Sequence, residues 1–269
     1  MKKEDKKNLR LYYILNYSIF LVMFTITGLV ITLDAPSWVQ TLFKNLCAWI
    51  STFIIILMYK RFYPGISIKQ YFKLHFGKKL KWEFFVIAFI IQLSIVILAC
   101  LIVCRKRSIS MEDLAYISWS TMLFQIIGHL LGGATGEELG WQGYALNKLQ
   151  EYYSPIKATF IDSILWGVWH FPILLISGYT GINFLLYFVV FLIALIAFSV
   201  MSNYFYNKTK NILISMWMHF LFNFFFGMAI LATGLDNLTL LIPVCAGYCI
   251  VAVIILFILR NKKSVEEID

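Results

Sequence analysis

Charged side chains are scarce in this sequence. Only 14% of its 269 residues are Asp, Glu, Lys or Arg, while 61% are hydrophobic. A soluble domain carries about 25% charged residues, so a soluble globular protein is excluded. The net charge of +9 could suggest nucleic acid, but the basic residues lie between the hydrophobic runs, as membrane-flanking charges do. We therefore expect the lipid bilayer as a partner, and no nucleic acid.

Several motifs are also missing. The five cysteines form no C-x-x-C pair, which argues against a zinc ribbon or a thioredoxin-like site. We expect them to pack as small apolar side chains. The compact H-E-x-x-H metalloprotease motif is absent, and no internal repeat or low-complexity segment stands out. The chain is predicted to form a single integral membrane domain over residues 1–269.

Long apolar runs, by contrast, are abundant. A helix needs about 20 mostly apolar residues to cross a bilayer, so the runs predict an all-α polytopic membrane protein with about eight transmembrane helices. The first run is too long for the core of a signal peptide and is expected to be retained. The predicted spans are 11–33, 38–59, 83–104, 113–133, 155–177, 182–204, 210–232 and 238–259.

The basic residues are unevenly distributed between the ends of these spans. With the N-terminus in the cytosol, three of the 23 Lys and Arg residues, at 105–107, lie outside, Lys44 lies within a span, and the other 19 lie inside. Because cytosolic loops are enriched in Lys and Arg, we expect a multi-pass protein of the cell membrane with both termini in the cytosol.

Residues 66–81 are too polar to span the bilayer. Ile68, Phe72 and Phe76 recur every four residues with lysines between them. This pattern predicts an amphipathic helix at the surface of anionic lipid, with a plain basic loop as the alternative. His75 lies in the same segment and is expected at the surface.

Five polar side chains interrupt apolar runs where a membrane helix ordinarily has none. An ionisable residue inside the bilayer costs on the order of a few kcal/mol, so its default interpretation is functional. Two ordinary roles compete with this interpretation: acids at a helix start can complement the helix dipole, and a buried histidine can be a hydrogen-bonded core residue. The five are Glu137, Glu138, His170, His219 and Asn223.

The two acids follow a glycine-rich stretch. Glu137 and Glu138 project about 100° apart on a helix, so we expect them to have different roles, with Glu138 pointing to a neighbouring helix or polar partner. His129 lies slightly more than two turns before Glu137 and is a secondary candidate. Glycines that recur every four residues predict a smooth face for close helix packing and a weak point in the helix; they are Gly128, Gly132, Gly136 and Gly140.

The histidines have informative neighbours. Trp166 lies one turn before His170, so an indole is expected to flank the imidazole, and Pro172 is expected to kink the span. His219 and Asn223 are spaced i,i+4 and therefore share a helix face.

This set of side chains suits hydrolysis. A buried carboxylate beside a histidine can hold and deprotonate a water molecule, and a second imidazole with an amide N–H can stabilise an oxyanion. Together they suffice to hydrolyse an amide without a Ser, Cys or Thr nucleophile. The alternative is a metal site, because one Glu and two His form a known catalytic zinc set.

Three segments, in this order, resemble the CPBP family of CAAX proteases and bacteriocin-processing enzymes, also called the Abi family. The family motif E-E-x-x-x-R corresponds to residues 137–142, where Gln142 replaces the arginine. The motif F-x-x-x-H corresponds to residues 166–170, where Trp166 replaces the phenylalanine. The motif H-x-x-x-N/D corresponds to residues 219–223.

The resemblance covers roughly residues 120–232 and implies an intramembrane glutamic endopeptidase, of a kind long called a metalloprotease. It implies that Glu137 is the general base on the attacking water, that His170 binds that water, and that His219 and Asn223 form the oxyanion site. Glu138 would support them, Trp166 keeps an aromatic wall, and Gln142 can hydrogen-bond but cannot neutralise a carboxylate.

The implied substrate is a peptide or a membrane protein, and the implied bacterial roles are peptide maturation and bacteriocin self-immunity. No cofactor is expected; zinc held by Glu137, His170 and His219 is the alternative. Because Gln142 removes a cation, a non-catalytic membrane scaffold or immunity protein is an alternative function. A proton-coupled transporter is another, although such transporters often contain repeats that this chain lacks.

Overall fold

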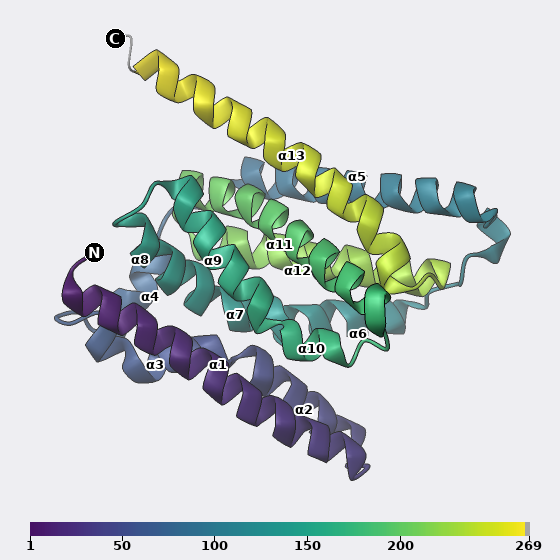
Figure 1. Ribbon diagram of the computed structural model, residues 1–269, viewed down its shortest axis with the longest axis horizontal. Helices are drawn as coiled ribbons and strands as arrows, with labels where there is room; N and C mark the ends of the chain where they lie inside the picture. The colour runs from purple at the N-terminus through teal and green to yellow at the C-terminus, as the bar shows by residue number, and fades with distance from the viewer. Residues whose placement is uncertain (267–269) are drawn as a thin grey trace.

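The computed structural model describes residues 1–266, and these residues form helices joined by short loops, with no strand among them (Figure 1). Two of the segments, η2 and η3, are π-helical, and η1 is a 3₁₀ turn. The elements are α1 (Lys3–Thr32), α2 (Ser37–Ala48), α3 (Ile50–Phe62), α4 (Ile68–Phe76), α5 (Trp82–Arg107), η1 (Met111–Asp113), α6 (Trp119–His129), η2 (Leu130–Ala134), α7 (Thr135–Gly140), η3 (Trp141–Leu146), α8 (Asn147–Gln150), α9 (Pro155–Trp169), α10 (Phe171–Leu175), α11 (Gly181–Thr209), α12 (Ile212–Thr233) and α13 (Asn237–Glu266).

The long helices confirm an all-α, multi-pass membrane protein. In the described part of the chain, α1, α5, α11, α12 and α13 are each long and apolar enough to cross a membrane, and α2 with α3 forms a sixth candidate bent by 51°. Two predicted spans, 113–133 and 155–177, contain the shorter helices α6 and α9, of 11 and 15 residues. The count of eight spans stays a prediction.

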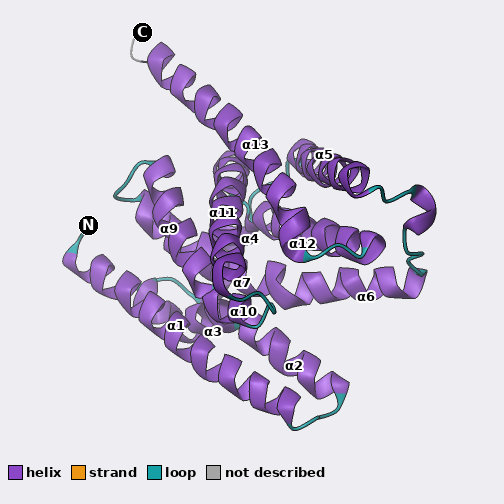
Figure 2. Ribbon diagram, turned by 45° about the vertical axis from the view of Figure 1, so that its right-hand side comes forward, coloured by secondary structure: helices purple, strands orange, loops and turns teal. Residues whose placement is uncertain are grey.

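The helices are arranged in three groups. Helices α1, α2 and α3 pack on one another at one side, and α5 and α13 lie at the other (Figure 2). Between them lie α7, α11 and α12; α7 packs on α3, and α11 packs on α9, α12 and α13. The predicted site residues therefore lie between the two outer groups, on α7, at the end of α9 and on α12.

Helix α9 ends three residues before Pro172. The last α9 residue is Trp169, and α10 begins at Phe171 with the proline in its first turn. A proline in a first turn lacks only an N–H that would be unpaired there anyway. The expected interruption thus leaves His170 at the junction between the two helices.

Helix α4 buries most deeply two side chains beside the apolar stripe seen in the sequence, while Ile68 and Phe76 of the stripe are partly buried. Its N-terminus has a capping box formed by Ser67 and Gln70. Tyr71 and His75 are buried against the rest of the protein, whereas Phe72 is exposed. The expectation that His75 lies at the surface was therefore wrong, because the ring packs between Tyr71 and the backbone at Gly143.

Candidate active site

The two carboxylates stand on α7, between the two π-helical segments. At Gly133, just before α7, the backbone leaves the helical conformation, with φ 177° and ψ −66°. The glycine-rich face then packs closely on α2 and α3: a Cβ at Gly136 would lie 2.7 Å from the Trp49 ring. Ser51 on α3 also donates a hydrogen bond to the carbonyl of Glu137 at 2.9 Å. Small side chains therefore fix the position of α7.

Glu137 is buried, at 4% exposure, and its carboxylate faces α9. Oε2 accepts a hydrogen bond from Trp166 Nε1 at 2.8 Å and lies 3.8 Å from His170 Nε2. His170 Nδ1 lies 2.9 Å from the Trp166 carbonyl oxygen. Because a carbonyl can only accept, Nδ1 carries a proton, and Nε2 of the neutral ring is an acceptor. One water molecule can donate to both acceptors, Glu137 Oε2 and His170 Nε2.

Glu138 faces α12 instead. Its Oε1 lies 2.8 Å from His219 Nδ1, and the side chain is 1% exposed. When this pair holds two protons, one lies between Oε1 and Nδ1, and the other is on His219 Nε2, which is then a hydrogen-bond donor. The adjacent acids thus contact different helices, as their 100° separation predicts.

The missing side chain of Gly133 marks the point where these groups meet. A Cβ on Gly133 would lie 3.3 Å from Glu137 Oε1, 3.4 Å from His219 Nε2 and 3.4 Å from Asn223 Nδ2. One acceptor oxygen and two nitrogen atoms able to donate therefore surround a single small space. Only glycine leaves that space open.

Three further residues, Trp166, Gln142 and His129, differ in how closely they approach the space at Gly133. Trp166 is expected from the sequence only as an aromatic wall, but its indole lies between the two imidazoles, with ring centroids 5.8 Å from His170 and 5.3 Å from His219. Gln142 is buried in η3, and its Oε1 has no hydrogen-bond partner in the described part of the chain. His129 packs against α12 at Gly227, one turn beyond Asn223.

Two features escaped the sequence analysis. The Trp166 N–H bond to Glu137 could have been anticipated, because tryptophan, unlike phenylalanine, carries a donor. Asp162 on α9 is 2% exposed and accepts a hydrogen bond from the Tyr13 hydroxyl at 3.2 Å. It is an ionisable residue in an apolar run, so the criterion that identified Glu137 should have identified it too.

The fit of the site to a metal ion can be tested from its donor atoms. Among the described residues, no three His, Cys, Asp or Glu side chains are arranged to hold one ion. The Nδ1 atoms of both candidate histidines are engaged by protein oxygens, so only their Nε2 atoms could contact an ion. These side chains, as arranged, do not form a three-ligand metal site.

Comparison with known proteins identifies the same region. Residues 118–225 match the family model of the type II CAAX prenyl endopeptidase Rce1-like proteins. The chain is also 31% identical, over 162 residues, to the CAAX prenyl protease 2 of Methanococcus maripaludis. This alignment covers 56% of the chain and 55% of the relative, so the chain spans about half the length of the curated relative that it matches. The matched segment contains all of the residues that meet around Gly133.

Proposed function

We propose that this protein is an intramembrane endopeptidase of the CPBP family in which Glu137 activates the attacking water; residues 118–225 match the Rce1-like type II CAAX prenyl endopeptidase model. The observation that carries the proposal is the convergence at Gly133. One carboxylate oxygen, one imidazole nitrogen and one amide nitrogen lie within 3.4 Å of the same point. A base next to two donors is the arrangement that addition of water to a peptide carbonyl requires.

The reaction begins with a water held between His170 Nε2 and the Glu137 carboxylate. As the water oxygen bonds to the carbonyl carbon, one of its protons passes to Glu137. The carbonyl oxygen becomes an oxyanion, which accepts hydrogen bonds from His219 Nε2 and Asn223 Nδ2. The C–N bond then breaks, and Glu137 returns the proton to the leaving amine.

Glu138 sets the donor of this oxyanion site. Its carboxyl group engages His219 Nδ1 at 2.8 Å. In the form of this pair that holds two protons, the second proton is on Nε2, where it can be donated to the oxyanion. Glu138 is therefore a positioning residue that acts through the imidazole, while Glu137 contacts the reacting water. This division explains why two adjacent acids are both buried at one site.

The substrate class follows from the matched family and from the name of the relative. We propose a peptide substrate that approaches within the membrane, and a prenylated peptide ending in a CAAX sequence is the first probe. Peptide maturation and bacteriocin self-immunity are the cellular roles that suit a small membrane endopeptidase of this kind. An apolar prenyl chain would hold the peptide in the bilayer, close to the buried site.

The experiment compares cleavage of a farnesylated CAAX peptide by wild-type protein and by Glu137→Gln in liposomes, with products identified by mass spectrometry. Glu137→Gln keeps the shape of the side chain but removes the base, so we expect no detectable cleavage. Glu112→Gln removes an exposed carboxylate from η1 and serves as the control, with unchanged activity expected. Equal cleavage by wild type and Glu137→Gln would show that Glu137 is not the base.

We propose further that the reaction needs no metal. Asn223 is a poor zinc ligand but a good hydrogen-bond donor. Purified protein is expected to contain well under one zinc per chain by elemental analysis, and a chelator removed before the assay should leave cleavage intact. Activity that disappears with the chelator and returns with zinc would contradict this mechanism.

A further inference from the structure

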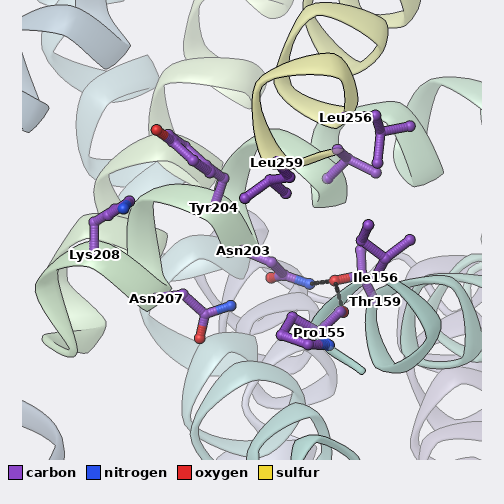
Figure 3. Close-up of a pocket in the computed structure, with 10 residues that line it drawn as sticks. Pro155, Ile156, Thr159, Asn203, Tyr204, Asn207, Lys208, Leu256 and Leu259 are labelled. Carbon is purple, nitrogen blue, oxygen red and sulfur yellow. Dashed lines mark hydrogen bonds between the residues drawn. The ribbon is translucent and has the colours of Figure 1, made fainter. Parts of the chain in front are cut away.

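Helix α13 borders cavities on two sides. On the side of α9 and α11 lies a cavity of about 190 Å³, in whose lining Asn203 donates a hydrogen bond to Thr159 at 2.9 Å (Figure 3). On the side of α5 lie two larger cavities of about 440 Å³ each, and Ile102 and Pro243 line both of them. The α5 side therefore holds one continuous space, along two helices that carry none of the candidate active-site residues.

One part of this space is an apolar groove. In the described part of the chain, Ser94 is the only polar residue that lines it, and the α13 wall is low because Ala246 and Gly247 carry a methyl group or no side chain. From Ile102 to Ile90 the groove follows α5 for twelve residues, which is about 18 Å of helix. Half of the hydrocarbon core of a bilayer is about 15 Å thick. The groove therefore has the length of one acyl chain within one leaflet.

The other part of the space is basic. Lys106 and Arg107, in the last turn of α5, line it together with Thr239 of α13. Arg107 Nη2 donates to Thr239 Oγ1 at 3.4 Å, and both basic side chains are exposed. Among the described residues, no carboxylate lines this part, and neither Lys106 nor Arg107 forms an ion pair.

The acids at this end of the helices are engaged by other donors or exposed. Asp236, at the start of α13, accepts three hydrogen bonds, two of them from Thr239 at 2.6 and 3.0 Å. Asp113 accepts from the backbone N–H and the hydroxyl of Ser110 at 2.6 and 2.8 Å. Glu112 is exposed in η1. The basic part of the space therefore favours an anion from outside the protein.

The order of the two parts matches a phospholipid at the surface of a membrane. Basic side chains at the ends of membrane helices reach the interface, where lipid phosphates lie. In the topology predicted from the charges, residues 105–107 are the three basic residues on the outer side. A basic cavity at the interface, followed by an apolar groove one leaflet deep, has the chemistry of a charged headgroup and its acyl chain.

We propose that the space between α5 and α13 binds one anionic glycerophospholipid. The phosphate lies at Lys106 and Arg107, and one acyl chain fills the groove toward Ile90. The lipid holds the two helices together beyond the hydrogen bond from Arg107 to Thr239. This inference concerns a structural lipid and does not depend on the proposed peptidase activity. It gives a role to two of the three basic residues on the outer side.

The test measures lipid binding to the delipidated, full-length protein in detergent by native mass spectrometry. Phosphatidylglycerol is expected to bind about fivefold or more tightly than phosphatidylcholine of the same chain length, the ratio that one basic side chain near an anionic headgroup gives. Glycerol phosphate, which has no acyl chain, should not bind measurably. Equal binding of the two lipids would overturn the proposal, and so would binding of glycerol phosphate as tight as that of phosphatidylglycerol.

Charge variants locate the headgroup. Replacing both Lys106 and Arg107 by Gln should abolish the preference for phosphatidylglycerol. Arg105→Gln is the matched control, because it removes one charge from the adjacent position, which does not line the cavity, and it should retain the preference. A preference that survives the double variant would overturn the proposal. So would a preference that falls as far in Arg105→Gln as in Lys106→Gln.

A variant of the groove locates the acyl chain. Ala246 is exposed in the groove wall, so Ala246→Leu places a larger side chain in the groove without filling the protein core. Phosphatidylglycerol and phosphatidylcholine should both bind severalfold more weakly to this variant, with the ratio between them unchanged. Unaltered binding of both lipids would overturn the placement of the acyl chain between α5 and α13.

Discussion

Buried and partly buried histidines occur in two regions of this protein, and their surroundings differ. At the candidate active site, His170 and His219 each have one ring nitrogen engaged by a protein oxygen and the other close to the open space near Glu137. In α4, His75 is 2% exposed, but its Nε2 has no hydrogen-bond partner among the described residues, and the nearby rings belong to Tyr63 and Tyr71. Burial alone therefore does not identify a reactive histidine; the convergence of complementary polar atoms does.

The largest expected effect comes from filling the space at the active-site region. In Gly133→Ala, the new methyl group would lie 3.3–3.4 Å from Glu137 Oε1, His219 Nε2 and Asn223 Nδ2. It would occupy the position of the reacting oxygen, so we expect cleavage of the farnesylated peptide to fall by at least about 10²-fold, the usual cost of losing oxyanion stabilisation.

Gly128→Ala is the matched control for this substitution. It lies in the same glycine-rich stretch, but a Cβ there meets nothing within 4 Å. Activity should stay within about twofold, because an alanine in a helix is if anything more stable than a glycine. If Gly133→Ala folded and cleaved as Gly128→Ala does, the space at Gly133 would not be the reaction site.

A smaller effect is expected from the donor that holds the base. Trp166→Phe restores the residue of the family motif but removes the N–H that Glu137 Oε2 accepts at 2.8 Å. A hydrogen bond to a charged group is worth about 1.5–3 kcal/mol, so we expect kcat to fall by roughly tenfold or more.

Trp169→Phe is the control for Trp166→Phe. Trp169 is equally buried, but its Nε1 has no hydrogen-bond partner in the described structure. Removing that N–H should leave cleavage unchanged. A loss of activity as large in Trp169→Phe would attribute the effect to aromatic packing and not to the hydrogen bond to Glu137.

The sequence predicted the long helices because each contains one uninterrupted apolar run, as in α5 and α11. It also predicted that Glu137 and Glu138 diverge, since that follows from helix geometry alone. It did not predict the π-helical segments on either side of α7, because an extra residue per turn depends on packing against other helices. For the same reason, the space at Gly133, a residue outside the four-residue glycine series, could not be recognised from the sequence.

The misassignment of His75 has a similar origin. Periodicity identified the face of α4 that contains Phe72, which is apolar and exposed. The protein-facing side, with Tyr71 and His75, is polar by composition. It is buried because Tyr63, just before α4, and the distant Gly143 cover it. Composition can reveal an amphipathic helix but not which of its faces meets protein and which meets lipid.

The smallest expected effect on catalysis comes from this second region, where His75 should alter stability without altering chemistry. Burial lowers the pKa of His75 from its ordinary value of 6.5 to about 4. Protonation therefore favours the unfolded state, and the stability contributed by the neutral ring is present above pH 6.5 and is lost as the pH falls toward 4. At about pH 5 the loss should reach roughly 2 kcal/mol, or several degrees in Tm.

Thermal unfolding in detergent checks this. Between pH 7.5 and pH 5, the Tm of wild type should fall more than the Tm of His75→Phe, which has no titrating group at this position. Peptide cleavage near pH 7.5 should be equal in the two proteins. Equal declines in Tm would mean that the pKa of His75 is the same in the folded and unfolded protein. A loss of cleavage in His75→Phe would extend the catalytic region to α4 and remove the contrast between the two regions.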